Sequence, residues 1–486
     1  MTTASEQAGA VIDARGAMLE TLELQRKAFR AEGFVQYGTR IDRIERCIAL
    51  LVDNQEAICN ALSADYGCRS PYITRMAEIM TSVGNLKHVK KKLKSWMKPE
   101  RRSAPVPMNL FGARALVYHQ PKGVVGNMTP WNIPVGMVFS PMADILGAGN
   151  RVMIKPSEFT PHTSELTREL IGRYFDRSEI AVMTGGPEVG AAFASLPFDH
   201  LLFTGATSIG RMVMRAAAEN LTPVTLELGG KSPVIVSASA DIEDTAGKIV
   251  TGKGQNAGQL CIAPDYAFVP ESRLEVFLES CRKNFVAQYP TTVLNPDYNA
   301  MINERHYDRV LGYIEEARAA GARIIELNPG REDFSDRVRH KIPLHIVVNP
   351  DDGLKVMQEE IFGPVLVVKT YRDIGECIAY VNARARPLAL YWFGRDEAER
   401  ERVLRETISG GVSVNNVMMH FACDDLPFGG VGGSGMGHYH GRDGFRTFSH
   451  AKGVFREGRL NLSKLAGTLP PFGPKLAKML DGQIRK

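Results

Sequence analysis

The chain has 486 residues, 44% of them hydrophobic and 23% charged, which is ordinary for a globular enzyme of roughly two to four folding units. Its formal net charge of +5 is small for this length and argues against nucleic acid as the main partner. The seven cysteines are scattered without a CxxC pair, so we expect neither a disulfide framework nor a metal site, and no apolar run approaches the roughly 18 residues of a membrane span. The first ten residues lack a signal pattern, and we expect a cytoplasmic protein.

The N-terminal part of the chain is expected to be helical. Residues 19–96 have apolar side chains at helix-like spacing, and prolines follow from Pro99 onward. Eight basic residues fall between Lys87 and Arg102. Such a run is typical of the solvated face of an amphipathic helix, and contact with nucleic acid or an anionic membrane is the alternative.

After Pro121, short apolar strands alternate with helical segments. The predicted strands cover residues 123–128, 152–156 and 200–205, and the predicted helices cover residues 138–146, 164–174 and 208–219. This alternation indicates βαβ units of a parallel sheet, in which ligands bind beyond the carboxyl ends of the strands. Four polar or small residues fall at those ends: Lys155, Glu158, Thr204 and Gly205.

A second α/β unit is expected from about Thr225. Its predicted strands cover residues 232–236, 266–269, 364–369 and 411–414, and its predicted helices cover residues 274–285 and 307–321.

The clearest chemical signal is the segment Gly254–Cys261, in which one cysteine follows a loop of small and amide residues. Such a loop lets a substrate approach the thiol closely. Glu227 and Asn132 offer a base and an amide donor, which complete the groups needed for covalent acyl chemistry. Each residue also has a purely structural alternative, as a buried cysteine, a salt-bridged carboxylate or a loop-shaping asparagine.

Two glycine-containing turns are candidates for phosphate binding. Thr204–Gly210 reads as a strand-to-helix turn whose free N–H groups suit a phosphate, and a plain tight turn is an equal alternative. Gly430–Gly435 has the literal GxGxxG spacing but follows no apolar strand. We therefore interpret the second turn as a loop near the substrate entrance.

These segments resemble the aldehyde dehydrogenase superfamily over nearly the whole chain. The resemblance is carried by residues 130–134, 155–158, 203–205, 227–231, 254–261 and 359–364, and by the 34-residue interval from Glu227 to Cys261. Residues 263–266 and 427–450 resemble the class 3 branch, and residues 24–34 and 155–161 are similar to the bacterial coniferyl aldehyde dehydrogenases. Three residues depart from the usual family pattern and affect the packing around the site: Ile133, Leu260 and Gly433.

The resemblance implies an α/β fold with a Rossmann-like cofactor domain, an α/β catalytic domain and a β-strand oligomerisation flap. It implies that residues 1–224 form the NAD-binding domain, with an oligomerisation segment near residues 103–120. Residues 225–420 would form the catalytic domain, and residues 421–486 would return to the cofactor domain and end in a tail. It also implies a homodimer.

The same resemblance assigns roles to individual residues. Cys261 would attack the aldehyde, Asn132 and the Cys261 N–H would stabilise the oxyanion, and Glu227 would activate water to hydrolyse the thioester. A base role for Glu360 is the alternative in the class 3 branch. NAD is the implied cofactor, with NADP possible, because a carboxylate at Glu158 repels a 2′-phosphate. The cofactor-binding residues would be Lys155, Glu158, Thr204, Gly205, Ser208, Trp131, Glu360 and Phe362.

The implied reaction is oxidation of an aldehyde to the acid, and the expected substrate is aromatic, such as coniferaldehyde, which would give ferulate. A long aliphatic aldehyde and a non-catalytic NAD-binding relative are alternatives. An acylating enzyme that uses coenzyme A is disfavoured by Glu227, since thiolysis needs no such base. A non-redox thioesterase or amidase would need neither Lys155 nor Glu360.

Overall fold

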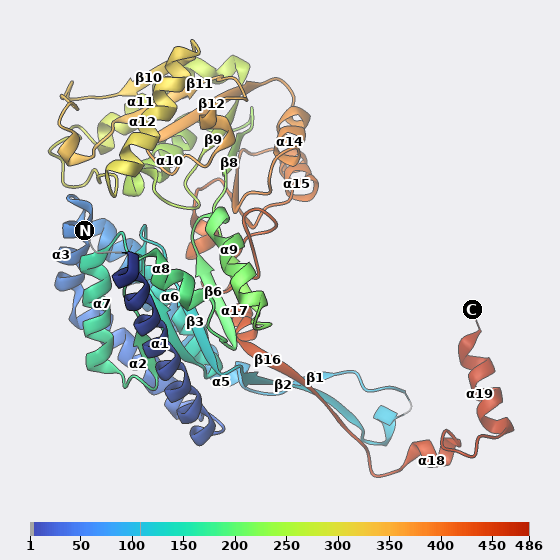
Figure 1. The fold of residues 1–486 in the computed structure, drawn as a ribbon. Coiled ribbons are helices and arrows are strands. Elements are labelled where there is room, and N and C mark those ends of the chain that lie inside the picture. Colours follow the sequence, from blue (N-terminus) through green and yellow to red (C-terminus); the bar gives the residue numbers. More distant parts are fainter. Residues whose placement is uncertain (1–3, 107, 486) are drawn as a thin grey trace.

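Two mostly parallel sheets and a projecting three-stranded sheet organise the chain (Figure 1). The computed structural model describes residues 4–106 and 108–485. The predicted α/β class is confirmed, since helices alternate with parallel strands in both large sheets.

The first sheet has six strands in the order β15-β7-β6-β3-β4-β5. Its strands are β3 (Val124–Met128), β4 (Arg151–Lys155), β5 (Ile180–Val182), β6 (His200–Thr204), β7 (Val224–Glu227) and β15 (Gly435–Met436). Strands β3 to β7 run parallel, and β15 pairs antiparallel with β7. The three predicted strands correspond to β3, β4 and β6, whereas the sequence did not predict the short strands β5 and β7.

Helices cover this sheet and bury its apolar side chains. They are α6 (Pro134–Ala148), α7 (Pro161–Tyr174), α8 (Pro187–Ala194) and α9 (Thr207–Ala218). Helix α17 (Gly441–Thr447) packs on α5 (Thr81–Trp96), α6 and β16 (Ser449–Arg456) instead. Every residue of α6 is buried, because this apolar helix lies between the sheet and the N-terminal helices. Helix α6 therefore gives the chain segment before it, around Asn132, a rigid support.

The N-terminal helices are α1 (Ala4–Glu32), α2 (Tyr37–Asp53), α3 (Gln55–Tyr66), α4 (Pro71–Ile73) and α5 (Thr81–Trp96). A π-helix over Thr74–Met80, which the sequence did not predict, separates α4 from α5. Helix α5 buries Leu86, Val89 and Leu93 and exposes Lys87 and Lys91, so the predicted amphipathic helix is confirmed. Arg101 and Arg102 lie beyond it in β1 (Glu100–Arg102).

The second sheet has seven strands in the order β10-β11-β12-β9-β8-β13-β14. They are β8 (Pro233–Val236), β9 (Tyr266–Pro270), β10 (Arg323–Leu327), β11 (Leu344–Val348), β12 (Val365–Tyr371), β13 (Ala389–Phe393) and β14 (Gly411–Val414). Only β10 runs antiparallel to its neighbour among these described strands. The second unit is expected to start at about Thr225, but Thr225 lies in β7 of the first sheet, so the chain enters the second sheet only after Glu227. The bounds of the domains stay predictions.

Six helices and three short 3₁₀ segments connect the strands of the second sheet. The helices are α10 (Ile242–Gly254), α11 (Leu274–Gln288), α12 (Glu304–Ala319), α13 (Lys355–Gln358), α14 (Ile374–Asn382) and α15 (Glu397–Glu406), with 3₁₀ turns at Gln255–Gly258, Glu271–Arg273 and Arg337–Arg339. Helix α16 (Met419–Ala422) follows β14 and leads back to the first sheet.

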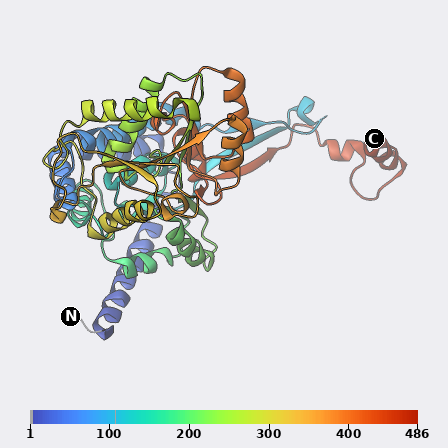
Figure 2. The same cartoon turned by 90° about the horizontal axis from the view of Figure 1, so that it is seen from above.

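The third sheet projects from the body as a ribbon, and both views show it reaching away with the C-terminal helices beyond it (Figures 1 and 2). It consists of β1 (Glu100–Arg102), β2 (Arg114–Pro121) and β16 (Ser449–Arg456), all antiparallel, with a 3₁₀ turn at Met108–Phe111. Helices α18 (Leu462–Ala466) and α19 (Pro474–Ile484) follow. Within residues 4–106 and 108–485, none of the helices has the length and hydropathy needed to span a bilayer.

Leu202, in the central strand β6, is fully buried and tests the core of the first sheet. Replacing it by alanine removes apolar contacts and leaves a cavity, so we expect Leu202→Ala to lower the free energy of unfolding by about 2–5 kcal/mol. Thermal unfolding followed by circular dichroism measures the effect. Leu294→Ala is the matched control because Leu294 is 73% exposed, and its midpoint should stay that of the wild type. Equal midpoints for the two variants would contradict the described core.

Candidate active site

The parallel strands bring four of the predicted site residues to one edge of the first sheet. Lys155 ends β4, Thr204 ends β6 and Glu227 ends β7, while Asn132 follows β3 by a short loop. Because carboxyl ends of parallel strands share an edge, these side chains meet where ligands bind in such sheets. Cys261 comes to this edge from the second unit, after α10.

The loop before Cys261 has an unusual backbone. Asn256, Ala257 and Gly258 have φ angles of 48°, 50° and 72°, so three successive residues are left-handed. For a residue with a Cβ this conformation costs roughly 1–2 kcal/mol. A Cβ on Gly258 would lie 2.3 Å from the backbone oxygen of Gly363, so this position needs glycine. The sequence predicts a loop of small residues here but not its handedness.

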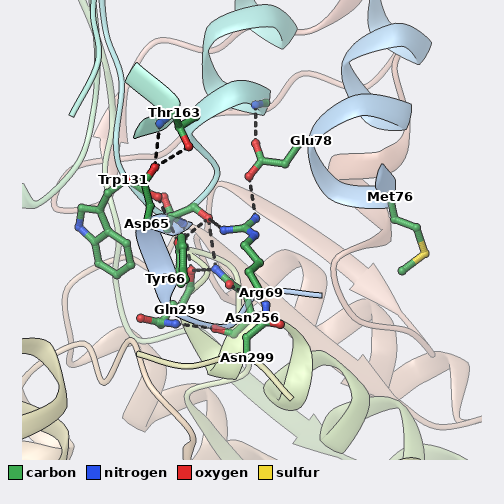
Figure 3. Close-up of polar contacts among 12 residues, drawn as sticks. Asp65, Tyr66, Arg69, Met76, Glu78, Trp131, Thr163, Asn256, Gln259 and Asn299 are labelled. Carbon is green, nitrogen blue, oxygen red and sulfur yellow. Dashed lines mark hydrogen bonds and ion pairs between the residues drawn. The ribbon is translucent and has the colours of Figure 1, made fainter. Parts of the chain in front are cut away.

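Side-chain amides hold this loop against Asn132. The Asn132 Nδ2 donates to the Gln259 carbonyl at 3.1 Å, and the Asn256 Nδ2 donates to the Asn132 carbonyl at 3.2 Å. Asn299 Nδ2 in turn donates to the Asn256 Oδ1 at 3.1 Å, and Gln259 Nε2 donates to the Ala300 carbonyl at 3.0 Å. Figure 3 shows Asn256, Gln259 and Asn299 lying close to Arg69. Asn132 and the cysteine loop therefore form one hydrogen-bonded unit.

Three ionisable groups lie together at this site: Glu227 is buried, and Cys261 and Glu360 are half-buried. Burial, together with the charges of Glu360 and Glu227, raises the pKa of the Cys261 thiol to about 12. Burial also raises the pKa of Glu227 well above its usual range and, aided by Asp265, that of Glu360 to about 8. Within the described residues, neither carboxyl oxygen of Glu227 has a hydrogen-bond partner. A carboxyl in this state can take up a proton near neutral pH.

Basic side chains hold the backbone around Glu360. The Arg309 guanidinium donates to the carbonyls of Ile361 at 2.9 Å and of Glu360 and Phe362 at 3.3 Å. The Lys231 ammonium donates to the Glu359 carbonyl at 3.0 Å. Phe362 has a φ of 46°, and its ring packs edge-on against Trp131 with the ring centroids 5.3 Å apart. No local sequence pattern marks Arg309, because its contacts lie about fifty residues away along the chain.

The remaining predicted residues lie along the same edge. The buried Lys155 ammonium donates to the Pro156 carbonyl at 2.8 Å and lies 3.8 Å from the Glu158 carboxylate. Gly205 lies in the turn between β6 and α9, and Ser208 is exposed in the first turn of α9, whose N-terminus has no side-chain cap. The Thr204 hydroxyl and the Glu360 Oε1 are buried without a partner among the described residues. A helix N-terminus and orphaned polar atoms fit the pyrophosphate and ribose hydroxyls of a dinucleotide.

The Gly430–Gly435 segment is part of the sheet edge. Its Gly433 and Ser434 carbonyls accept hydrogen bonds from the Thr207 hydroxyl and the Leu228 N–H, at 3.1 and 3.0 Å. Gly435 begins β15 rather than a helix. Rejection of this GxGxxG as a dinucleotide fingerprint is therefore confirmed.

Comparisons with known proteins agree with this geometry. The model of the aldehyde dehydrogenase family matches residues 14–454. A probable coniferyl aldehyde dehydrogenase of Caulobacter vibrioides is 52% identical, covering 97% of this chain and 98% of its own, and a coniferyl aldehyde dehydrogenase of a Pseudomonas species is 50% identical, covering 95% of both. The substrate-bound state of Staphylococcus aureus AldH has a TM-score of 0.89 at 34% identity, covering 96% of this chain and 99% of its own.

The raised pKa of Cys261 predicts how the thiol reacts without cofactor. Only the thiolate is alkylated, so iodoacetamide should modify Cys261 slowly at pH 7 and faster as the pH rises toward 12. Glu360 ionises near pH 8 and opposes the thiolate, so the rise should be less than about tenfold per pH unit above pH 8. Glu360→Gln should accelerate alkylation there. Mass spectrometry of the Cys261 peptide measures the rate, and a rate independent of pH between 7 and 9 would contradict the burial argument.

Proposed function

The chain belongs to the aldehyde dehydrogenase family, and from this premise we propose that it oxidises an aromatic aldehyde such as coniferaldehyde to its acid, with Cys261 as the nucleophile. The protein is an enzyme that uses NAD(P), as its family does. The observation that carries the assignment is the position of Cys261, which shares one buried edge with Glu227 and Asn132.

The protein's own groups account for the covalent steps. The Cys261 sulfur attacks the aldehyde carbon and gives up its proton, for which a buried carboxyl with a raised pKa is a suitable acceptor. The second hydrogen of the Asn132 amide and the Cys261 N–H stabilise the oxyanion that forms. After oxidation the acyl group remains on Cys261 as a thioester, and Glu227 activates the water that hydrolyses it. Glu360 is the alternative base.

The cofactor would lie along the edge from Lys155 to Phe362. Lys155 and Glu158 would hold the adenosine ribose, Thr204, Gly205 and Ser208 the pyrophosphate, Glu360 the nicotinamide ribose, and Trp131 and Phe362 would pack beside the nicotinamide. When bound, the nicotinamide supplies the acceptor for the hydride that leaves the substrate carbon. A carboxylate at Glu158 repels a 2′-phosphate, so NAD is the preferred form.

Two relatives of about 50% identity support an aromatic substrate, since both are named for coniferyl aldehyde. Long aliphatic aldehydes are the competing substrates. Seven cysteines without a disulfide among the described residues support a reducing compartment, and we place the enzyme in the cytoplasm.

A kcat/KM panel tests the substrate assignment. We expect coniferaldehyde and cinnamic aldehydes to react faster than long aliphatic aldehydes, NAD to exceed NADP, and Cys261→Ala to lose turnover while it still binds NAD. NADH absorbance measures the rates.

Three outcomes would contradict parts of this assignment. A preference for a fatty aldehyde would overturn the aromatic substrate. A coenzyme A thioester as product would show that coenzyme A, and not water, cleaves the thioester on Cys261. Wild-type protein that forms no NADH with any aldehyde would be a non-catalytic relative.

The projecting ribbon supports a homodimer. Its strand β16 is an edge strand, and the ribbon exposes apolar side chains, among them Leu110 at 76% and Phe455 at 52%. An exposed strand edge with apolar side chains is a typical pairing surface. We therefore propose that the ribbon docks on a second copy of the chain.

Phe455→Asp tests this interface. A charge on the ribbon should separate the dimer, and sedimentation should then give the 53.5 kDa mass of one chain instead of twice that mass. Val276→Asp, at a residue 57% exposed on α11, is the control and should keep the wild-type mass. A monomeric wild-type protein, or an unchanged mass for Phe455→Asp, would count against the ribbon as the interface.

A further inference from the structure

We propose that Arg69 and Glu78, neither of which the chemical steps use, are positioning residues that hold the Asn132 amide in place for the oxyanion. The inference rests on the proposed oxyanion role of Asn132 and extends it to a buried ion pair between the loop that joins α3 to α4, where Arg69 lies, and the π-helix that carries Glu78. Both side chains are completely buried, and Arg69 Nη2 lies 2.6 Å from Glu78 Oε1. Figure 3 shows the pair bridging from the π-helix to the amide cluster.

The pair holds the chain at two points, the Asn132 carbonyl and the backbone four residues later at Gly136. Arg69 Nη1 donates to the Asn132 carbonyl at 2.8 Å. Glu78 Oε2 accepts from the Gly136 N–H at 2.6 Å, in the first turn of α6. The contacts close a ring from Arg69 through Asn132, α6 and Glu78 back to Arg69. A carboxylate at the helix N-terminus also suits the helix dipole.

The Asn132 carbonyl receives more donors than a structural role needs. Besides Arg69, the Asn256 amide donates to it at 3.2 Å, and the Tyr66 hydroxyl lies 3.1 Å from it and shares its one hydrogen with the Trp131 carbonyl at the same distance. A carbonyl oxygen has two lone pairs, and Arg69 and Asn256 together occupy them and fix its direction. Because this carbonyl and the amide side chain belong to the same residue, the direction of the carbonyl constrains where the amide points.

Stability alone does not explain why this ion pair is buried. Removing two charges from water is expensive, and a buried pair is often no more stabilising than apolar side chains of the same size. Glu78 also lies on the π-helix Thr74–Met80, a form of helix that is rare and frequent at functional sites. A requirement to hold Asn132 in a fixed position explains both the buried ion pair and the π-helix, whereas a requirement for stability explains neither.

Arg69→Lys separates positioning from charge. Lysine keeps the positive charge but lacks the planar fork that reaches Asn132 and Glu78 together. We expect the single-turnover rate of thioester formation with coniferaldehyde and saturating NAD to fall by about 10- to 100-fold, as small displacements of a catalytic group do. The dissociation constant of NAD and the KM of the aldehyde should stay near the wild-type values.

Arg43→Lys is the matched control. Arg43 is also buried and contacts two carboxylates, Glu179 at 2.9 Å and Glu32 at 3.0 Å. Glu179 directly precedes β5, so this pair lies at the amino ends of the strands, opposite the site. Arg43→Lys should lower thermal stability and leave the rate of thioester formation unchanged. An equal loss of rate in both variants would overturn the inference, since any buried arginine would then have the same effect.

A double-mutant cycle with Asn132→Ala shows whether Arg69 acts through Asn132. In the Asn132→Ala background, Arg69→Lys should change the rate by no more than about twofold. Full additivity of the two losses would overturn the positioning role while leaving the oxyanion assignment intact. An unchanged rate for Asn132→Ala alone would overturn the oxyanion assignment and this inference with it. If Arg69→Lys does not fold, Glu78→Gln carries the same cycle, and a wild-type rate for that variant would overturn the inference.

Discussion

Cys261, Glu227 and Glu360 share one site, Glu227 buried and the other two half-buried, and loss of hydration disfavours the ionised form of each of them. Ionising any of the three raises the cost of ionising the others, so their protonation states are coupled. Near neutral pH the thiol therefore becomes nucleophilic as its proton passes to a neighbouring base. This coupling requires that the three groups and the oxyanion donor keep fixed relative positions.

Two sets of contacts supply that rigidity. Amide side chains and the Arg69–Glu78 ion pair hold Asn132 and the left-handed loop. Arg309 and Lys231 hold the backbone on either side of Glu360. The strained backbone at Asn256 and Ala257 persists because the surrounding contacts over-determine it, as is common at functional sites.

The sequence predicts the parts of this molecule that depend on local pattern. The strands that end at Lys155 and Thr204, and the helix after Asn132, follow from hydrophobic periodicity and turn residues. The family follows from ordered motifs, and the comparisons confirm it. Neither the local pattern nor the family motifs predict the ion pair, because Arg69 contacts a carbonyl 63 residues away and Glu78 an N–H 58 residues away. A buried arginine has no local signature, and neither does a π-helix.

The residue beside Tyr66 links the contacts around Asn132 to the cofactor side. Asp65 accepts hydrogen bonds from the backbone N–H groups of His162 and Thr163, at 2.9 and 2.8 Å, at the start of α7. Helix α7 follows the loop that carries Glu158, so residues 65–69 touch both halves of the catalytic edge. Chimeras of related enzymes joined between Glu78 and Asn132 would take the Arg69–Glu78 ion pair from one parent and the Asn132 segment that it holds from the other. Viable recombinants should therefore inherit the third helix through the sixth as one block.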